Sequence, residues 1–538
     1  MNKLFSFFSF KLTQMQLILI VSAFLVFFDN YTFFYQLLET YGAEGKTFFY
    51  VMTTPFVLFI VNVLFFLLLS YRWTIKPVLI LVLVISSFVA YFMDSYHIIV
   101  DKGMIHNTLE TDMQESLGLL NSRLVMYVLL LGLLPTYFVY KVNLVKAGFK
   151  GEVFSRLKIF VSVLVLFAVI AWSAGGFYAS LFKEHRVLRN YTNPYFWIKS
   201  SISYTKHALR RSGPIVVVPI GLDAKVMHHK DEKPKLVIFI VGEATRADHF
   251  GINGYARETT PKIEKRENLV SFSNFYSCGT YTVYSVPCIF SKYDRSTFSR
   301  EKEEETENVM DLLAHTGEVD LLWRDNNSDP KGVMQRLGYE DYRSTERNSV
   351  CEGECRDEGM LHGLDHFIEN NTTRNKLIVL HAMGNHGPEY YKRYPKAFEK
   401  FTPVCRSNLL EECTQEEIAN AYDNILLYSD DFIDKSISLL EQYENKYNVV
   451  LFYVSDHGES LGEKGLYLHG LPYMIAPDAQ KHVAALMWFG KEFKTLNIDS
   501  LNKKSTLRYS HDNIFSTLLG LFDVNSTLYE SDKDILKL

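Results

Sequence analysis

Five apolar segments near the start of the chain restrict its fold more than any other feature of the sequence. They cover approximately residues 16–38, 47–70, 77–96, 124–140 and 157–182. A helix of about 20 apolar residues is long enough to cross a bilayer. Asp29-Asn30 interrupts the first segment and the fourth segment is short, so the ends of these helices are less sharply defined. The sequence therefore predicts a transmembrane domain of five helices over residues 1–183.

Basic residues indicate how this domain is oriented, because short cytoplasmic loops are rich in Lys and Arg. The amino-terminal segment and the loops on its side of the membrane contain Lys3, Lys11, Arg72, Lys76, Lys141, Lys146, Lys150, Arg156 and Lys158. The opposite loop, at 95–122, is acidic. We therefore expect a cytoplasmic amino terminus and a large domain outside the cytoplasm. A cleaved signal peptide is the alternative, but no small-residue cleavage site follows the first segment.

Six cysteines, all in the second half of the chain, support the same orientation. They lie in three close pairs: Cys278 with Cys288, Cys351 with Cys355, and Cys405 with Cys413. Six cysteines allow 15 connectivities, but pairing within each couple requires the least rearrangement of the chain. Free thiols or a thiolate metal site are the alternatives, although the sequence has no Cys-x-x-Cys motif. Disulfides indicate an oxidising compartment such as the periplasm.

The region at 184–230 mixes aromatic and basic residues. They are Tyr191, Tyr195, Phe196, Trp197, Lys199, Tyr204, Lys206, Arg210 and Arg211. Such residues on short amphipathic helices suit the bilayer interface. A solvated linker packed against the next domain is the alternative. In either case this region would keep the following domain near the membrane surface.

From residue 231 to residue 538, apolar runs typical of strands alternate with helical stretches. The runs lie at 235–243, 321–323, 377–381, 448–455 and 482–489, and helical periodicity is clearest at 415–443. This alternation predicts an α/β domain in which helices sandwich a mostly parallel sheet. The net charge of −5 and the lack of a long Lys/Arg block argue against nucleic-acid binding as the main task.

Two of these runs end in candidate metal ligands. The first is followed by Glu243, and the run at 448–455 is followed by Asp456-His457. Ligands of open α/β sheets collect at the carboxyl ends of the strands, so these three side chains are expected to meet at one sheet edge. Two carboxylates and an imidazole, joined by a hydroxyl oxygen, would form a four-coordinate zinc site. Taken alone, Glu243 is equally consistent with a carboxylate at the start of a helix. Asp456-His457 is equally consistent with a helix N-cap followed by a structural histidine.

The segment 277–288 is the expected source of the hydroxyl oxygen. It places five hydroxyl-bearing residues between two cysteines and then continues into the apolar Ile289-Phe290. We interpret it as a nucleophile loop that leads into a helix. A metal would lower the pKa of one hydroxyl and hold it as a nucleophile. Residue chemistry alone does not choose among Thr280, Thr282, Tyr284 and Ser285.

Several other polar residues are candidates for contact with substrate. His386 and His469 lie in Gly/Pro loops, where they would ligate a second metal, bind a phosphoryl oxygen or act as general acid. Lys331 would neutralise an anionic substrate, unless it is an ordinary surface lysine. His381 ends an apolar strand and is expected to be structural. In the acidic outer loop, one helical face is either solvated or a platform for a lipid headgroup. Its residues are Asn107, Thr111 and Glu115.

Together these motifs resemble those of the lipid A phosphoethanolamine transferases of Gram-negative bacteria, the group that includes the mobile colistin-resistance enzymes. The resemblance covers nearly the whole chain and implies five spans, an interfacial linker and an alkaline-phosphatase/sulfatase-like domain. One departure is Tyr281, which is bulky where a small residue is expected. The matching motifs are Val241-Gly242-Glu243-x-Thr245-Arg246, Cys278-Gly279-Thr280-x-Thr282, Ser285-Val286-Pro287-Cys288, Asn385-His386-Gly387-Pro388 and Ser455-Asp456-His457-Gly458-Glu459-Ser460-Leu461-Gly462-Glu463.

The resemblance implies a role for each matching residue. Thr282 corresponds to the nucleophile. The ligands that complete a catalytic zinc site around it correspond to Glu243, Asp456 and His457. His386 and His469 correspond to groups that contact substrate or a second zinc. Lys331 and Ser328 correspond to phosphate-binding groups. Headgroup residues on the membrane side correspond to Asn107, Thr111 and Glu115, and the six cysteines correspond to three local disulfides.

The same resemblance implies transfer of phosphoethanolamine from phosphatidylethanolamine to a phosphate of lipid A, through a covalent intermediate on Thr282. The loss of negative surface charge would then give resistance to polymyxins and other cationic peptides. We expect a monomeric inner-membrane protein with zinc as cofactor and membrane lipids as partners. The alternatives are another acceptor, such as a core sugar or glycan, a phosphodiesterase- or sulfatase-type hydrolase, and a non-catalytic membrane scaffold.

Overall fold

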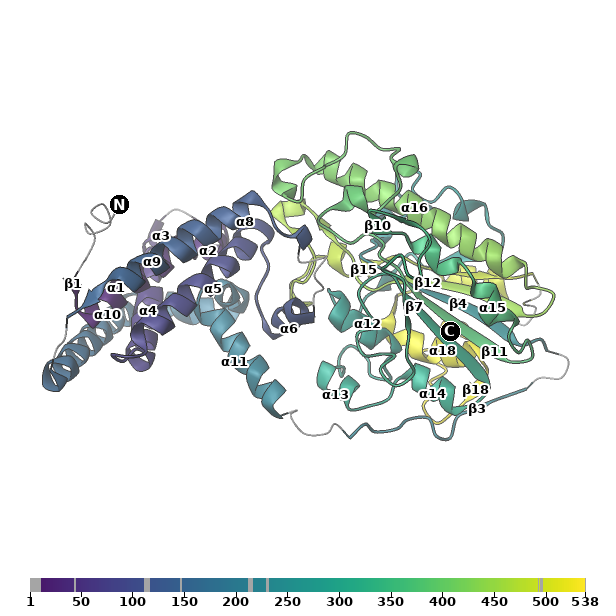
Figure 1. Cartoon of the computed structure of the whole chain (residues 1–538), viewed down its shortest axis with the longest axis horizontal. Helices are drawn as coiled ribbons and strands as arrows, with labels where there is room; N and C mark the ends of the chain where they lie inside the picture. Colours follow the sequence, from purple (N-terminus) through teal and green to yellow (C-terminus); the bar gives the residue numbers. More distant parts are fainter. Residues whose placement is uncertain are drawn as a thin grey trace. The chain divides into compact units, whose positions relative to one another are not determined.

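The computed structural model describes residues 11–42, 45–110, 117–145, 148–210, 216–228, 232–491, 493 and 497–537. The chain forms two compact units. The helical unit comprises residues 1–109 and 120–210, and the α/β unit comprises residues 110–119 and 211–538 (Figure 1).

The helical unit consists almost entirely of apolar helices. Its only strands among the described residues, β1 (Lys11–Leu12) and β2 (Asn143–Leu144), pair in parallel. The helices are α1 (Gln14–Phe28), α2 (Tyr31–Tyr41), α3 (Gly45–Val51), α4 (Thr54–Leu69), α5 (Ile75–Tyr96), α6 (Lys102–Glu110), α8 (Ser122–Tyr127), the π-helix η1 (Val128–Leu133), α9 (Leu134–Lys141), α10 (Phe149–Glu184), the 3-10 helix η2 (Arg186–Tyr191) and α11 (Tyr195–Arg210).

Four helical stretches in this unit are long and apolar enough to cross a membrane: Phe48–Leu69, Ile75–Tyr96, Ser122–Lys141 and Phe149–Ala179. Helices α1 and α2 form a fifth span if they are counted together, with a bend of 56° between them. The bend lies at the predicted interruption, where the Asn30 side chain donates a hydrogen bond to the Leu25 carbonyl at 2.8 Å. The same carbonyl accepts from the Asp29 N–H at 3.2 Å, so the Asn30 side chain reinforces the last backbone bond of α1 at the bend.

The start of α11 is held to the helical unit by a buried polar network. The Asn30 amide donates to the Asn193 carbonyl at 2.7 Å, and the Asn193 backbone N–H donates to Asn30 Oδ1 at 2.9 Å. The Trp197 indole N–H donates to Asn193 Oδ1 at 3.2 Å. Within the predicted interfacial region, the start of α11 is therefore anchored to the apolar helices of this unit.

A seven-stranded sheet organises the α/β unit, in the order β5-β16-β12-β4-β11-β7-β8. The five strands from β12 to β8 are parallel, whereas β16 runs antiparallel to both of its neighbours. The mostly parallel α/β sheet predicted from the sequence is confirmed. The strands are β5 (Leu269–Ser271), β16 (Ala485–Phe489), β12 (Asn448–Ser455), β4 (Lys235–Gly242), β11 (Asn375–His381), β7 (Val319–Asp325) and β8 (Glu340–Asp341).

The apolar run at 482–489, expected as one strand, is divided between two sheets. β15 (His482–Val483) joins a three-stranded sheet with β6 (Phe275–Tyr276) and β17 (Tyr509–Ser510), and β16 joins the main sheet. Ala484, between them, donates to the Thr245 carbonyl and accepts from the Ser455 N–H, both at 3.0 Å. These bonds, to a residue just beyond β4 and to the last residue of β12, explain why the run changes sheets. The other short strands are β3 (Lys225–Val226), β9 (Cys351–Glu352), β10 (Glu354–Cys355), β13 (Ser460–Leu461), β14 (Tyr467–Leu468) and β18 (Val524–Asn525).

Helices cover both faces of the main sheet (Figure 1). The long α16 (Gln415–Glu441), predicted from its periodicity, lies on one face and begins with a capping box between Thr414 and Glu417. Three helices that share the opposite core are α12 (Thr282–Phe290), α14 (Val309–His315) and α18 (Ile514–Leu521). The remaining α-helices are α13 (Arg300–Glu304), α15 (Leu364–Glu369) and α17 (Ile498–Lys504).

Three disulfides close short loops of the α/β unit. They join Cys278 to Cys288, Cys351 to Cys355, and Cys405 to Cys413, which are the pairs expected from the sequence. The bond between Cys278 and Cys288 links the segment before α12 to the last turn of that helix. It therefore ties together the two ends of the predicted nucleophile segment.

Phe239→Ala should destabilise the α/β unit, because Phe239 is fully buried and packs edge-on against Phe290 and Phe452. Loss of a buried aromatic ring typically costs about 3–5 kcal/mol. Thermal unfolding of the purified full chain should show a lower midpoint, whereas Leu507→Ala, at an exposed position, should change it little. Equal effects of the two substitutions would contradict this assignment of the core.

Candidate active site

Strands β4 and β12 place two carboxylates side by side at the carboxyl edge of the sheet. The strands are parallel neighbours in a register that pairs Gly242 with Ser455, so the following residues, Glu243 and Asp456, leave the sheet together. The Asp456 N–H donates to the Gly242 carbonyl at 2.9 Å, and the Ala244 N–H donates to Asp456 Oδ1 at 3.1 Å. Both acidic residues and His457 are fully buried.

Thr282 brings a hydroxyl to the same point. Its Oγ donates to Glu243 Oε2 at 3.1 Å and lies 3.3 Å from His457 Nε2. Helix α12 begins at Thr282 itself, earlier than the loop interpretation of this segment suggested. The hydroxyl therefore lies at a helix amino terminus, where the backbone dipole favours negative charge and phosphate groups.

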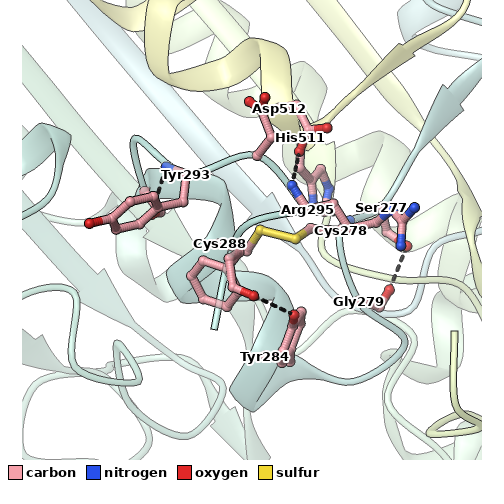
Figure 2. The surroundings of a disulfide bond; sticks show 12 residues. Ser277, Cys278, Gly279, Tyr284, Cys288, Tyr293, Arg295, His511 and Asp512 are labelled. Atoms are coloured by element: carbon pink, nitrogen blue, oxygen red, sulfur yellow. Dashed lines mark hydrogen bonds between the residues drawn. A yellow bond between two sulfur atoms is a disulfide. The ribbon is translucent and has the colours of Figure 1, made fainter. Parts of the chain in front are cut away.

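Three other hydroxyls of the segment make no hydrogen bond to Glu243 or His457 among the described residues. Thr280 donates to the Leu471 carbonyl at 2.7 Å, and Tyr284 donates to the Phe298 carbonyl at 3.3 Å (Figure 2). Ser285 Oγ is buried and has no hydrogen-bond partner among the described residues. Within the described part of the chain, only Thr282 offers a hydroxyl to Glu243 and His457. The geometry thus separates Thr282 from the alternatives that the sequence left open.

A disulfide and a buried histidine hold the segment before α12 in place. Figure 2 shows the bond between Cys278 and Cys288 beside His511. His511 Nδ1 accepts from the Cys278 N–H, and its Nε2–H donates to the Ser455 carbonyl, both at 3.0 Å. One imidazole therefore joins the nucleophile segment to the end of β12, directly before Asp456.

Tyr281, the bulky residue of this segment, occupies the N-cap position of α12. Its ring lies 5.9 Å from that of Tyr284, which in turn packs edge-on against Phe298 at 4.9 Å. The aromatic side chain is thus directed along the helix toward other rings. It leaves Thr282 in contact with Glu243 and His457.

The buried polar atoms at this sheet edge fit a metal ion. Glu243 Oε1 and Asp456 Oδ2 are buried and have no hydrogen-bond partner within the described residues. His457 Nε2 lies 3.2 Å from Glu243 Oε1 and 3.3 Å from Asp456 Oδ2. Two buried carboxylates that meet at one nitrogen require a positive charge beside them. The ligand atoms of these three residues lie within 4.8 Å of one another. Two carboxylates, an imidazole and a hydroxyl form a donor set suited to a divalent cation.

The pKa shifts of Asp456, His457 and Glu243 show that this site favours positive charge. Burial raises the pKa of Asp456, and the Glu243 carboxylate raises it further, to about 6. Burial lowers the pKa of His457, but Asp456 and Glu243 more than reverse this and raise it to about 10. Burial also raises the pKa of Glu243, whereas His457 holds it well below the usual range. Without a metal, protonated His457 would therefore have to offset the charge of both carboxylates. A divalent metal offsets the same charge and needs no proton on His457 Nε2.

His457 is oriented for coordination by its other ring nitrogen. Nδ1 lies 2.9 Å from the Gly458 carbonyl, an acceptor, so Nδ1 carries the hydrogen. Nε2 then presents a lone pair toward Glu243, Asp456 and Thr282. A fixed tautomer of this kind is typical of metal-binding histidines.

His386 and His469 lie beside this centre. The His469 ring is 4.2 Å from that of His457 and 6.1 Å from that of His386. Glu459 Oε2 lies 2.7 Å from His469 Nδ1 and fixes its tautomer, so that Nε2 is left to accept a proton or bind a metal. The structure therefore brings both predicted histidines to the site.

The loop that follows β7 contributes a residue that the sequence reasoning missed. Asn327 donates from Nδ2 to Glu243 Oε2 at 2.8 Å and to the Ala382 carbonyl at 3.1 Å. Its position just beyond an apolar strand was the available signal, as it was for Glu243. The predicted Ser328 and Lys331 are buried in the same loop. Lys331 Nζ lies 3.4 Å from Asp329 Oδ2, and the Lys331 carbonyl accepts from the Arg300 guanidinium at 3.0 Å.

His381 lies beneath the site and supports it structurally, as expected. Its Nδ1 is 2.8 Å from Asp325 Oδ2, which also accepts from the Trp323 indole at 2.9 Å. Asn107 lies on α6 in the helical unit, whereas Thr111 and Glu115 fall outside the described residues. Asn107 is therefore the one member of the predicted headgroup platform that the structure places.

Comparison with known proteins shows to which family this chain belongs. The sequence profile described as Sulfatase matches residues 235–524, and the one described as Phosphoethanolamine transferase EptA/EptB matches residues 58–209. The chain is 43% identical over 522 residues to phosphatidylethanolamine transferase Mcr-1 from Escherichia coli, and the alignment covers 94% of each protein. The chain belongs to the phosphoethanolamine transferase family.

Two further members of the family extend the similarity. Phosphoethanolamine transferase EptA from Escherichia coli K12 is 38% identical over 518 residues, covering 94% of each protein. The solved structure of the integral membrane lipooligosaccharide phosphoethanolamine transferase A from Neisseria meningitidis matches with a TM-score of 0.94, at 35% identity. The match covers 98% of this chain and 99% of that one. The likeness thus extends over both the helical unit and the sulfatase-type α/β unit.

Glu243→Gln should reduce the metal content of this phosphoethanolamine transferase, because it replaces a carboxylate of the donor set by a neutral amide. Elemental analysis of the purified full chain should find a bound divalent metal in the wild-type protein and a large loss in the variant. Glu441→Gln, on the exposed side of α16, is the matched control and should retain wild-type content. Equal metal content in wild type and Glu243→Gln would contradict the proposed ligand.

Acid should destabilise the protein partly through His511. Burial lowers the pKa of this imidazole from 6.5 to about 3. Between these values the unfolded chain binds a proton that the folded chain excludes, so the free energy of unfolding falls as the pH decreases, by at most about 1.4 kcal/mol per pH unit. His511→Asn should show a shallower fall between pH 6.5 and 5 in thermal unfolding. Parallel pH profiles would contradict this account.

Proposed function

We propose that this protein transfers phosphoethanolamine from phosphatidylethanolamine to a phosphate of lipid A, with Thr282 as nucleophile and zinc as cofactor. The observation that carries the proposal is the contact of the Thr282 hydroxyl with both Glu243 and His457. The relative Mcr-1 is named a phosphatidylethanolamine transferase. The solved Neisseria protein is named a lipooligosaccharide phosphoethanolamine transferase.

In the first step, Thr282 Oγ forms a bond to the phosphorus of phosphatidylethanolamine. The bond from phosphorus to the diacylglycerol oxygen breaks, which leaves phosphoethanolamine on the threonine and diacylglycerol in the bilayer. Zinc, when bound by Glu243, Asp456, His457 and Thr282, would lower the pKa of the hydroxyl and offset charge on the phosphoryl group. The amino terminus of α12 favours the same charge.

In the second step, a phosphate oxygen of lipid A attacks the same phosphorus. A new phosphoanhydride bond forms, and the bond to Thr282 Oγ breaks, which regenerates the free hydroxyl. His386 and His469 supply the proton transfers: the proton released by the Thr282 hydroxyl in the first step is balanced by one donated to the leaving diacylglycerol oxygen, and a proton returns to Thr282 Oγ in the second step. His469 suits this role because Glu459 holds its Nδ1 and directs Nε2 into the site.

Two residues of the loop after β7 would help to bind and orient the phosphoryl group. Lys331 is nearly fully buried, and its ammonium has one carboxylate neighbour, Asp329 Oδ2 at 3.4 Å. A buried cation in the loop next to Asn327 suits an anionic substrate. Asn327 orients Glu243 through its 2.8 Å hydrogen bond and so keeps this carboxylate directed at Thr282.

The helical unit fits a reaction in which donor and acceptor are both lipids. Its apolar helices reach membrane-spanning length, and the disulfides of the α/β unit indicate an oxidising compartment. We place the protein in the bacterial inner membrane, with a cytoplasmic amino terminus and the α/β unit in the periplasm. Addition of an amine to lipid A would weaken binding of polymyxins and other cationic peptides.

Thr282→Ala should abolish transfer, since removal of a covalent nucleophile typically costs more than about 1000-fold in rate. Mass spectrometry of lipid A from cells producing the protein should show a phosphoethanolamine increment that disappears in this variant. Thr280→Ala, which removes a hydroxyl bonded to the Leu471 carbonyl, is the control and should retain the increment.

Three outcomes of this measurement would overturn the proposal. An increment that persists in Thr282→Ala would exclude the nucleophile. An increment found on a core sugar or glycan would change the acceptor. Unmodified lipid A together with released phosphoethanolamine would indicate a hydrolase.

A further inference from the structure

Two exposed arginines of the α/β unit, Arg295 and Arg508, differ from most others in that unit. Arginines elsewhere pair with carboxylates, as in Arg257 with Asp423 and Arg266 with Asp434. Arg295 and Arg508 form no ion pair with a carboxylate among the residues that the structure describes. Their guanidinium groups instead lie over aromatic rings. Such cations remain available to an anionic ligand.

These cations gather around two tyrosines. The Arg295 guanidinium lies 4.2 Å from the centre of the Tyr473 ring, and Lys481 Nζ lies 5.4 Å from it. The Arg508 guanidinium lies 4.2 Å from the centre of the Tyr276 ring. We call this surface the Tyr473 patch; it comprises Tyr276, Arg295, Tyr473, Met474, Lys481 and Arg508.

Few carboxylates offset this charge. Asp512 Oδ1 accepts from the Arg295 backbone N–H at 2.7 Å, a bond seen in Figure 2. Asp478 Oδ1 lies 3.7 Å from Lys481 Nζ and is the one carboxylate that the structure pairs with a cation of the patch. The patch therefore retains a positive balance from its two arginines.

Hydrogen bonds join the patch directly to the nucleophile segment. The Tyr473 hydroxyl donates to the Ser277 carbonyl at 2.9 Å, and the Ser277 N–H donates to the Lys481 carbonyl at 2.8 Å. The Gly470 N–H donates to the Thr280 carbonyl at 2.9 Å. The loop that carries Tyr473 is thus fixed to the residues that lead into Thr282, so a ligand on the patch would lie at the margin of the site.

Met474, next to Tyr473, is unusually exposed for an apolar residue. Its side chain is 94% exposed, and the loop holds it outside the hydrophobic core. A flexible thioether side chain suits contact with apolar chains of varied shape. The patch therefore combines cations with an apolar contact, which matches a phosphorylated lipid better than a soluble anion.

We infer that the Tyr473 patch is a subsite for the acceptor lipid, in which Arg295, Arg508 and Lys481 bind a phosphate of lipid A that is not being modified. This inference rests on the proposed function. The donor, phosphatidylethanolamine, has a phosphodiester and an ammonium group, and the ammonium group would be repelled by three cations. A phosphate monoester of the acceptor carries more negative charge and is the better match.

Separate measurement of the two half-reactions of the purified full chain distinguishes acceptor binding from the chemical steps. Intact-protein mass spectrometry first measures formation of the phosphoethanolamine adduct from phosphatidylethanolamine. Lipid A is then added at increasing concentration, and the rate of adduct loss gives the half-saturating acceptor concentration. Arg295→Gln/Arg508→Gln should raise this concentration by about tenfold or more while adduct formation stays within about twofold of wild type. Met474→Asp should raise it in the same direction.

Controls separate specific binding from general charge effects. Lys503→Gln removes an exposed charge from the neighbouring helix α17 and should leave both half-reactions unchanged. Added salt should raise the half-saturating concentration of wild type more than that of Arg295→Gln/Arg508→Gln. Phosphatidylglycerol should compete only weakly with lipid A.

Several results would overturn the inference. They are an unchanged acceptor dependence in Arg295→Gln/Arg508→Gln, equal slowing of both half-reactions, or full competition by phosphatidylglycerol at equal mole fraction. Equal slowing would mean that the arginines only support the nucleophile segment. A wild-type protein that forms no adduct would instead refute the proposed function, and the inference with it.

Discussion

Two fully buried carboxylates, Glu243 and Asp456, leave adjacent parallel strands side by side, and the rest of the α/β unit is arranged around them. Such a pair is unfavourable unless positive charge lies between its members. His457, which follows Asp456 directly, lies within 3.3 Å of both. The register of β4 and β12 thus brings two negative charges together at one edge of the sheet, and the proposed metal would neutralise them.

The second requirement is a hydroxyl held rigidly at the same place, and helix α12 supplies it. Thr282 is the first residue of that helix, and the segment before it is fixed by a disulfide, by His511 and by the loop around Tyr473. The disulfide is local, whereas His511 and Tyr473 come from two distant parts of the sequence. A small displacement of the hydroxyl would be costly for catalysis, so this support is part of the function that we propose.

The elements that sequence patterns predicted are those with strong local signals. The fully buried β4 and β12 and the amphipathic α16 belong to this group, and the residues just beyond the two strands marked the site. The start of α12 escaped because Thr, Tyr and Val are weak helix formers. Asn327 and His511 escaped because their roles depend on contacts across 84 and 233 residues of sequence. The division at Ala484 likewise depends on hydrogen bonds to other strands, which no local pattern records.

X-ray diffraction from crystals of the full chain, recorded on both sides of the zinc absorption edge, would test the central claim most directly. The account predicts an anomalous peak at the edge of the sheet, about 2.0–2.3 Å from donor atoms of Glu243, Asp456, His457 and Thr282. A zinc peak bound elsewhere, with the Thr282 hydroxyl outside its coordination sphere, would contradict it.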